Sequence, residues 1–103
     1  MKTFPKKQLS IVIEAPFLKR LLGCFDELDV PGYTVLPALA GRGQSGEWSR
    51  DSLSSDAGRM VQVEIILDAE KVSPVLESIS DILSLQMGIV TLSDVEVLRP
   101  DHF

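Results

Sequence analysis

The amino-acid sequence predicts an α+β domain whose elements follow the order β-α-β-β-α-β. Four segments alternate apolar and polar residues, as half-buried strands do, and two segments repeat apolar residues every three or four positions, as amphipathic helices do. The chain has 103 residues, of which 45% are hydrophobic and 24% are charged. These proportions are typical of a globular domain, so residues 1–103 are expected to fold around a single core.

The four expected strands are rich in β-branched residues. They span residues 8–14, 33–39, 60–67 and 89–98. In the first strand Leu9, Ile11 and Ile13 share one face, and the third strand repeats this pattern. Pro37 lies inside the second strand. Because proline has no N–H to donate to a neighbouring strand, the second strand is expected at an edge of the sheet.

Two amphipathic helices are expected between these strands. The first covers residues 16–28, where Pro16 suits the first helical turn. The second follows the third strand, and two starts are open: either Asp68 caps it, or Ser73 caps it with Pro74 at the first helical position. The apolar positions that define the two helices are Phe17, Leu18, Leu21, Leu22, Phe25 and Leu28 in the first, and Val72, Val75, Leu76, Ile79, Ile82 and Leu83 in the second.

This order of elements predicts a ferredoxin-like topology. Right-handed β-α-β connections place both helices on one face of a four-stranded antiparallel sheet, with the second and fourth strands at its edges. The opposite face is expected to carry four apolar residues, which are Val12, Leu36, Ile66 and Leu92. Such a face favours burial against further copies of the chain, which are also expected to supply partners for polar Gln62 and Glu64.

Charge and composition exclude several classes of function. The net charge of −5 disfavours a general role in nucleic-acid binding, which depends on surplus Lys and Arg. No apolar run reaches the length of a membrane span. The single cysteine, Cys24, cannot form an internal disulfide, so a cytoplasmic protein is expected. With one histidine, His102, the sequence offers no Ser/His/Asp set and no metal-ligand spacing, so we expect neither an enzyme nor a metal site.

A long segment without periodicity, residues 40–59, separates the second and third strands. Loops of this length in a small domain are usually functional. It opens with Gly41-Arg42-Gly43, whose backbone N–H groups can converge on an anion beside a guanidinium fork, and Gln44 and Ser45 add neutral donors. We therefore expect these residues to bind a phosphate or bicarbonate, although the glycines alone are equally consistent with a simple release of the chain into a loop.

The middle of the same segment carries Trp48, Arg50 and Asp51. Trp and Arg are common anchors of protein interfaces, so these residues are candidates for docking a partner protein. The alternative is that Trp48 folds back onto its own subunit. Both interpretations stay open on the sequence.

Three short motifs resemble the PII signal-transduction superfamily: Gly32-Tyr33-Thr34-Val35, the loop opening Gly41-Arg42-Gly43-Gln44-Ser45-Gly46, and the closing strand Val95-Glu96-Val97-Leu98-Arg99. The resemblance implies a homotrimeric regulator that binds adenine nucleotide (ATP, ADP or AMP) in clefts between subunits and contacts a target transporter or enzyme through the 40–59 loop. The nucleotide-binding residues that it implies are Thr34, Gly41, Arg42, Gly43, Gln44, Gly88 and Arg99.

The chain also departs from the family pattern. The 40–59 loop has no tyrosine, residues 85–88 have no lysine, and no second arginine follows Arg99. These departures weaken the expectation of tight triphosphate binding and of 2-oxoglutarate sensing. The sequence is more similar to divergent PII-like proteins, including a group associated with carboxysomes and bicarbonate transport, which implies bicarbonate as a second effector. The alternative is a metal-responsive trimer of the copper-tolerance type, linked to cation efflux.

Overall fold

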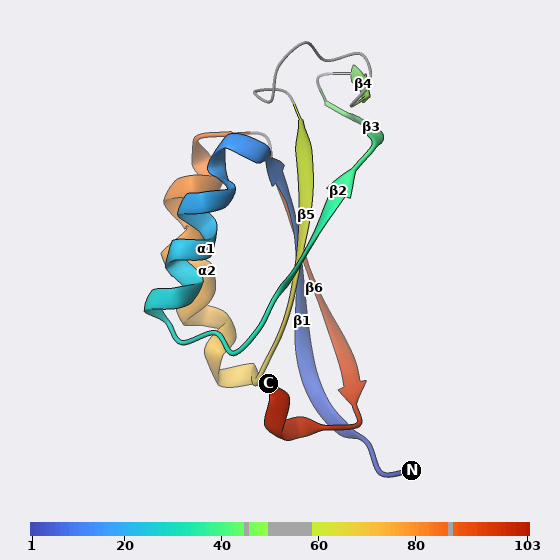
Figure 1. Ribbon diagram of the computed structural model, residues 1–103. Coiled ribbons are helices and arrows are strands. Elements are labelled where there is room, and N and C mark those ends of the chain that lie inside the picture. Colours follow the sequence, from blue (N-terminus) through green and yellow to red (C-terminus); the bar gives the residue numbers. More distant parts are fainter. Residues whose placement is uncertain (45, 50–58, 87) are drawn as a thin grey trace.

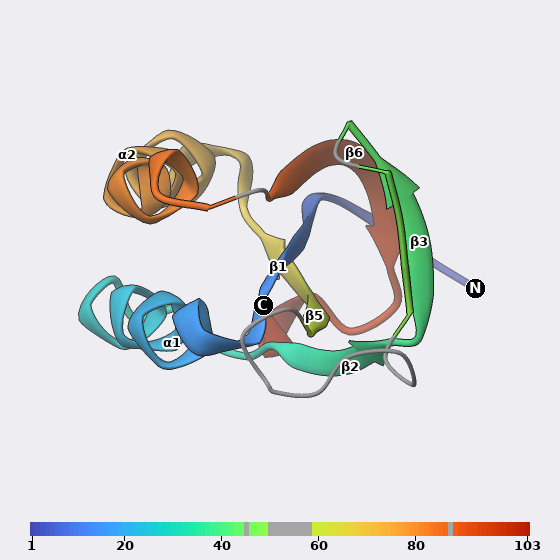
Figure 2. The same cartoon turned by 90° about the horizontal axis from the view of Figure 1, so that it is seen from above.

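The computed structural model describes residues 1–44, 46–49, 59–86 and 88–103. It confirms the α+β topology (Figure 1). The antiparallel sheet runs in the order β2 (Thr34–Ala38), β5 (Met60–Leu67), β1 (Phe4–Glu14) and β6 (Ile89–Val97). Figure 2 shows the helices α1 (Leu18–Glu27) and α2 (Ala69–Ser84) side by side on one face of the sheet. The strand that contains Pro37 lies at an edge, as its missing N–H requires.

The first strand is longer than the sequence suggested, because β1 begins at Phe4 rather than at residue 8. Its early part pairs with the end of β6, where Phe4 lies opposite Val97. The lysines that appeared to precede the strand form ion pairs along it: Lys7 with Asp94, and Lys6 with Asp68. The strand therefore continues through a segment that lacks apolar alternation because β6 pairs with it, and the ion pairs neutralise its basic residues.

The second helix begins at Ala69, so Asp68 occupies the N-cap position and the alternative start at Ser73 is wrong. The Asp68 carbonyl accepts a hydrogen bond from the Lys71 N–H at 3.0 Å, which closes the first turn. Its carboxylate makes no capping hydrogen bond and pairs with Lys6 instead. Pro74 consequently lies inside the helix, where it cannot donate a backbone hydrogen bond.

Part of the expected 40–59 loop is regular structure. A two-stranded sheet, β3 (Ala40–Gly43) and β4 (Gly46–Ser49), forms a hairpin separate from the four-stranded sheet. Gly46, which starts β4, has a φ of 104°, a backbone conformation that favours glycine. Sequence periodicity missed the hairpin because each strand has four residues and half of β3 is glycine. In Figure 1 the hairpin projects from the end of the sheet opposite the chain termini.

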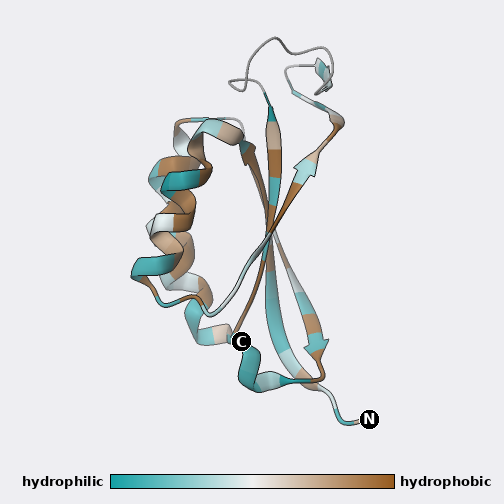
Figure 3. Ribbon diagram, in the orientation of Figure 1, coloured by the Kyte–Doolittle hydropathy of each residue, from teal (hydrophilic) through white to brown (hydrophobic). Residues whose placement is uncertain are grey.

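The core lies between the helices and the sheet, and Figure 3 shows the alternation of apolar and polar residues along the strands that builds it. Leu9, Ile11 and Ile13 are fully buried, as their shared face predicted. Phe25 of α1 is also fully buried and lies 6.1 Å from the Tyr33 ring, measured between ring centroids. The buried cluster comprises Leu9, Ile11, Ile13, Leu21, Phe25, Val61, Val63, Ile65, Leu67, Val75, Ile79 and Ile82.

The register corrects one member of the apolar set assigned to the open face. Leu92 lies opposite Leu9, whose side chain is in the core, so Leu92 belongs to the helix-covered side and is half exposed because β6 is an edge strand. Ile89 lies opposite Val12 and takes its place on the open face. With this exchange, the apolar set assigned to the open face becomes Val12, Leu36, Ile66 and Ile89.

Candidate functional site

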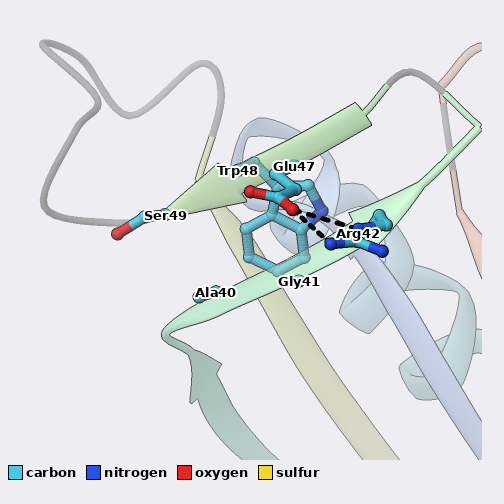
Figure 4. Close-up of a pocket in the computed structure, with 6 residues that line it drawn as sticks. All are labelled: Ala40, Gly41, Arg42, Glu47, Trp48 and Ser49. Carbon is cyan, nitrogen blue, oxygen red and sulfur yellow. Dashed lines mark hydrogen bonds and ion pairs between the residues drawn. The ribbon is translucent and has the colours of Figure 1, made fainter.

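The hairpin carries most of the residues that the sequence selected as a binding site. Gly41, Arg42 and Gly43 lie on β3, and Gln44 follows at the turn. A shallow, open pocket of about 670 Å³ lies against the hairpin, as Figure 4 shows. Its lining comes from both strands: Ala40, Gly41, Arg42, Glu47, Trp48 and Ser49. The predicted anion-binding segment therefore forms one wall of a pocket whose other wall includes a carboxylate.

Arg42 makes an ion pair within the hairpin. It lies directly opposite Glu47 in the β3–β4 register. The guanidinium Nε donates to Glu47 Oε1 at 3.1 Å, and Nη2 donates to the same oxygen. Both side chains are largely exposed, at 76% for Arg42 and 71% for Glu47. The sequence predicted that this guanidinium binds an external anion, and in the structure two of its donors bind a carboxylate of the same hairpin.

In this structure Trp48 packs within its own hairpin, and its part in docking a partner protein stays a prediction. It lies opposite Gly41, and its indole ring packs on that residue (Figure 4). A Cβ atom placed on Gly41 would come within 2.5 Å of the ring carbon Cζ2. Gly41 is therefore required for close approach of the indole ring, in addition to any role of its N–H group.

Gly88 lies at the same end of the sheet as the hairpin. It packs against the end of β1, where a Cβ on Gly88 would come within 3.0 Å of the Val12 carbonyl oxygen. Gln86 holds this segment in place, because its Oε1 accepts a hydrogen bond from the Glu14 N–H at 3.2 Å. Arg59, the residue before β5, is also at this end, where its carbonyl accepts a 2.7 Å hydrogen bond from the Ala15 N–H.

Thr34 lies away from the hairpin, on the open face of the sheet. It is exposed and sits opposite Glu64 in the neighbouring strand. Glu64 is the centre of a polar cluster in which it accepts hydrogen bonds from Gln8 at 2.5 Å, from Ser10 at 2.7 Å and from Gln62. Gln62 and Glu64 thus find hydrogen-bond partners within one subunit, so they do not need the further copies of the chain that the sequence suggested as a source of partners.

This cluster changes the titration of Glu64. Burial raises the pKa of the carboxyl, whereas the hydrogen bonds from Ser10, Gln62 and Gln8 lower it. The hydrogen bonds outweigh burial, so the pKa of Glu64 lies below its ordinary value of 4.5. Glu64 is therefore a fixed negative charge beside Thr34 at neutral pH.

Arg99 lies at the opposite end of the molecule from Gly88 and the hairpin. Gly88 immediately precedes β6, and Arg99 is exposed two residues beyond the end of that strand. The nine residues of β6 separate them, a length of about 30 Å at 3.3 Å per residue. One subunit therefore does not bring Arg99 and the hairpin residues to the same ligand.

Three of the predicted site residues, Ser45, Arg50 and Asp51, fall outside the described residues. Within residues 1–44, 46–49, 59–86 and 88–103, no three His, Cys, Asp or Glu side chains gather closely enough to share a metal ion. None of the helices in the same ranges is both long enough and apolar enough to cross a membrane.

Sequence reasoning overlooked Glu47 and Gln86. No local pattern pairs Glu47 with Arg42, and the two are brought opposite each other only by the β3–β4 register. Gln86 gave no local signal either. Its side chain bonds a backbone N–H that is 72 positions away in the sequence, a contact that only the folded chain creates.

Comparison with known proteins identifies a matching family model and a relative in another organism. A family model described as nitrogen regulatory protein P-II matches residues 6–102. A UPF0166 protein from Aquifex aeolicus (strain VF5) is 38% identical over 84 residues, which cover 81% of this chain and 77% of that protein.

Solved structures agree over almost the whole chain. One of them is CPII, a nitrogen regulatory PII-like protein from Thiomonas intermedia K12, in a structure bound to ADP, AMP and bicarbonate. It matches with a TM-score of 0.89 and 26% sequence identity, and the match covers 99% of this chain and 96% of that chain. A protein from Thermus thermophilus, described as a putative PII-like signaling protein, has a TM-score of 0.81 and 26% identity, covering 100% and 99% of the two chains. Because the family model matches nearly the whole chain and the fold agrees with these structures, the chain belongs to the nitrogen regulatory protein P-II family.

Proposed function

We propose that this protein is a PII-like regulator, not an enzyme, that binds adenine nucleotide (ADP, ATP or AMP) together with bicarbonate in the clefts of a homotrimer. The observation that carries the proposal is the near-complete structural match to CPII, whose structure contains ADP, AMP and bicarbonate. The binding residues are Thr34, Gly41, Arg42, Gly43, Gln44, Gly88 and Arg99. Ser45 joins the hairpin residues as an anion donor.

The geometry of one subunit supports a site shared between copies. Arg99 lies about 30 Å from Gly88 along β6, so the two can meet one ligand only if they come from different subunits. The open face of the sheet supports association as well, since it exposes Leu36 by 44% and Ile89 by 61%. Apolar side chains on such a face are stabilised when a second copy covers them.

The same proposal assigns a role to the remainder of the 40–59 segment. Trp48, Arg50 and Asp51 are the residues that we expect to contact a target transporter or enzyme. In the resting hairpin Trp48 packs on Gly41, so docking through its indole ring requires that contact to open. We place this regulation in the cytoplasm, the compartment favoured by the lone Cys24.

Isothermal titration calorimetry tests the proposal. ATP, ADP and AMP are titrated separately into the protein, each with and without sodium bicarbonate. We expect saturable binding of at least one nucleotide and tighter binding when bicarbonate is present. The coupling must be reciprocal, so the nucleotide must strengthen bicarbonate binding by the same factor.

Each negative result has a defined meaning. Nucleotide binding that ignores bicarbonate would remove the second effector and keep the nucleotide site. A lack of binding by all three nucleotides would refute the proposal. Titration with Cu²⁺ and Zn²⁺ under the same conditions tests the metal-responsive alternative.

A further inference from the structure

The Arg42–Glu47 pair has a consequence for ligand binding. Among the described residues that line the hairpin pocket, Arg42 is the only cationic side chain and Glu47 the only anionic one. Two of the guanidinium nitrogens, Nε and Nη2, already donate to Glu47 Oε1. An oxyanion that approaches this edge of Arg42 finds both donors already used. It is also repelled by the negative charge of Glu47.

We propose that Glu47 competes with the bound oxyanion for Arg42 and thereby sets the affinity of the site. This inference rests on the proposed function, because it concerns the phosphate or bicarbonate that Arg42 receives there. The guanidinium presents its donors in a fixed plane, and Glu47 occupies the edge formed by Nε and Nη2, so an oxyanion competes with Glu47 for this edge. Bidentate binding of an oxyanion at this edge therefore requires the pair to open.

The pair is weak enough to be displaced. Both of its side chains are more than two-thirds exposed. Water screens the attraction between exposed charges, so such ion pairs contribute little stability. Only one carboxylate oxygen of Glu47 receives the two hydrogen bonds. A phosphate or bicarbonate oxyanion can instead place one oxygen on each of the two donors, the bidentate arrangement that guanidinium groups favour.

The hairpin itself offers little resistance to rearrangement. It has four register pairs and is not hydrogen-bonded into the four-stranded sheet. Isolated two-stranded hairpins are marginally stable in water. Trp48 follows Glu47 directly on β4, so movement of Glu47 away from Arg42 is expected to change the environment of the only tryptophan in the chain.

Four proteins are compared by calorimetry and Trp48 fluorescence: wild type, Glu47→Gln, Arg42→Gln and Asp94→Asn. Asp94→Asn is the matched control, because it removes the same charge from another exposed pair, Lys7–Asp94, away from the hairpin. Sodium bicarbonate and ADP are titrated separately, so that the two sources of an oxyanion are distinguished.

We expect Glu47→Gln to bind the oxyanion about two- to fivefold more tightly than wild type, with a gain that shrinks at high salt. Asp94→Asn should match wild type, and Arg42→Gln should lose most of the affinity. The fluorescence change on binding should be smaller in Glu47→Gln, because its pair is already broken.

The failures of this inference and of the proposed function are separable. If wild type binds but Glu47→Gln binds no better, or if Asp94→Asn gains equally, competition by Glu47 is refuted while the proposed function stands. Unchanged affinity in Arg42→Gln also refutes it, since Arg42 is then not the contested group. If neither wild type nor Glu47→Gln binds either ligand, both proposals fail.

Discussion

The contact between Trp48 and Gly41 gives a sharp prediction for Gly41→Ala. The added Cβ would lie 2.5 Å from ring carbon Cζ2 and 2.9 Å from Cε2 of the indole, whereas ordinary contact begins at 3.4 Å. The ring must therefore move by about 1 Å or rotate away. Crowding of this kind costs about 1–3 kcal/mol, so the closed hairpin should become about five- to 150-fold less populated.

The single tryptophan makes this change directly measurable. We expect Gly41→Ala to shift Trp48 emission to longer wavelength and to increase its quenching by acrylamide. The unfolding free energy of the four-stranded sheet should change by less than about 0.5 kcal/mol, because the hairpin lies outside that core. Gly43→Ala is the matched control, since a Cβ at Gly43 meets nothing within 4 Å. Equal spectra for wild type and Gly41→Ala, or equal shifts for both variants, would refute the packing described for the hairpin.

Two further predictions concern stability. Leu9→Ala should lower the unfolding free energy by about 2–5 kcal/mol in urea titrations. The same change at Leu39, which is 69% exposed, should alter it by less than about 0.5 kcal/mol. Equal losses in the two variants would contradict the assigned core. Because the pKa of Glu64 is lowered in the folded protein, its stabilising effect is full above pH 4.5 and is lost as the pH falls through the folded-state value. Ser10→Ala should therefore cost about 1 kcal/mol at pH 7 and less at pH 3, and a cost independent of pH would exclude the Ser10–Glu64 interaction as its cause.

Much of the fold could be predicted from local patterns. The alternation of Leu9, Ile11 and Ile13 identifies the buried face of β1 because side chains on a strand alternate strictly. Pro37 identifies an edge strand because it lacks a donor. Patterns of this kind depend only on near neighbours in the sequence, and they were sufficient for the element order and the edge strands.

Other features depend on partners far away in the sequence. Leu92 was assigned to the wrong face because its side depends on its pairing with Leu9, which no local pattern reveals. The early start of β1 depends on Asp94 and Asp68, which neutralise Lys7 and Lys6. For the candidate site, the glycines, the arginine and the glutamine of the Gly41–Gln44 segment were sufficient to identify it as a candidate binding segment. The engagement of Arg42 by Glu47 became visible only with the β3–β4 register.

Adenine nucleotide is proposed to bind between subunits, and mixed oligomers test this arrangement most directly. Arg42→Gln and Arg99→Gln subunits with different affinity tags are co-expressed, and the mixed oligomers are isolated through both tags. ADP binding is measured at a concentration at which neither variant alone binds. Because each shared cleft takes one half from each neighbour, every mixed trimer should regain one intact cleft, about a third of the total. Nucleotide binding by wild type with no recovery in the mixed oligomers would show that Arg42 and Arg99 do not share a cleft between subunits, and would contradict the proposed site.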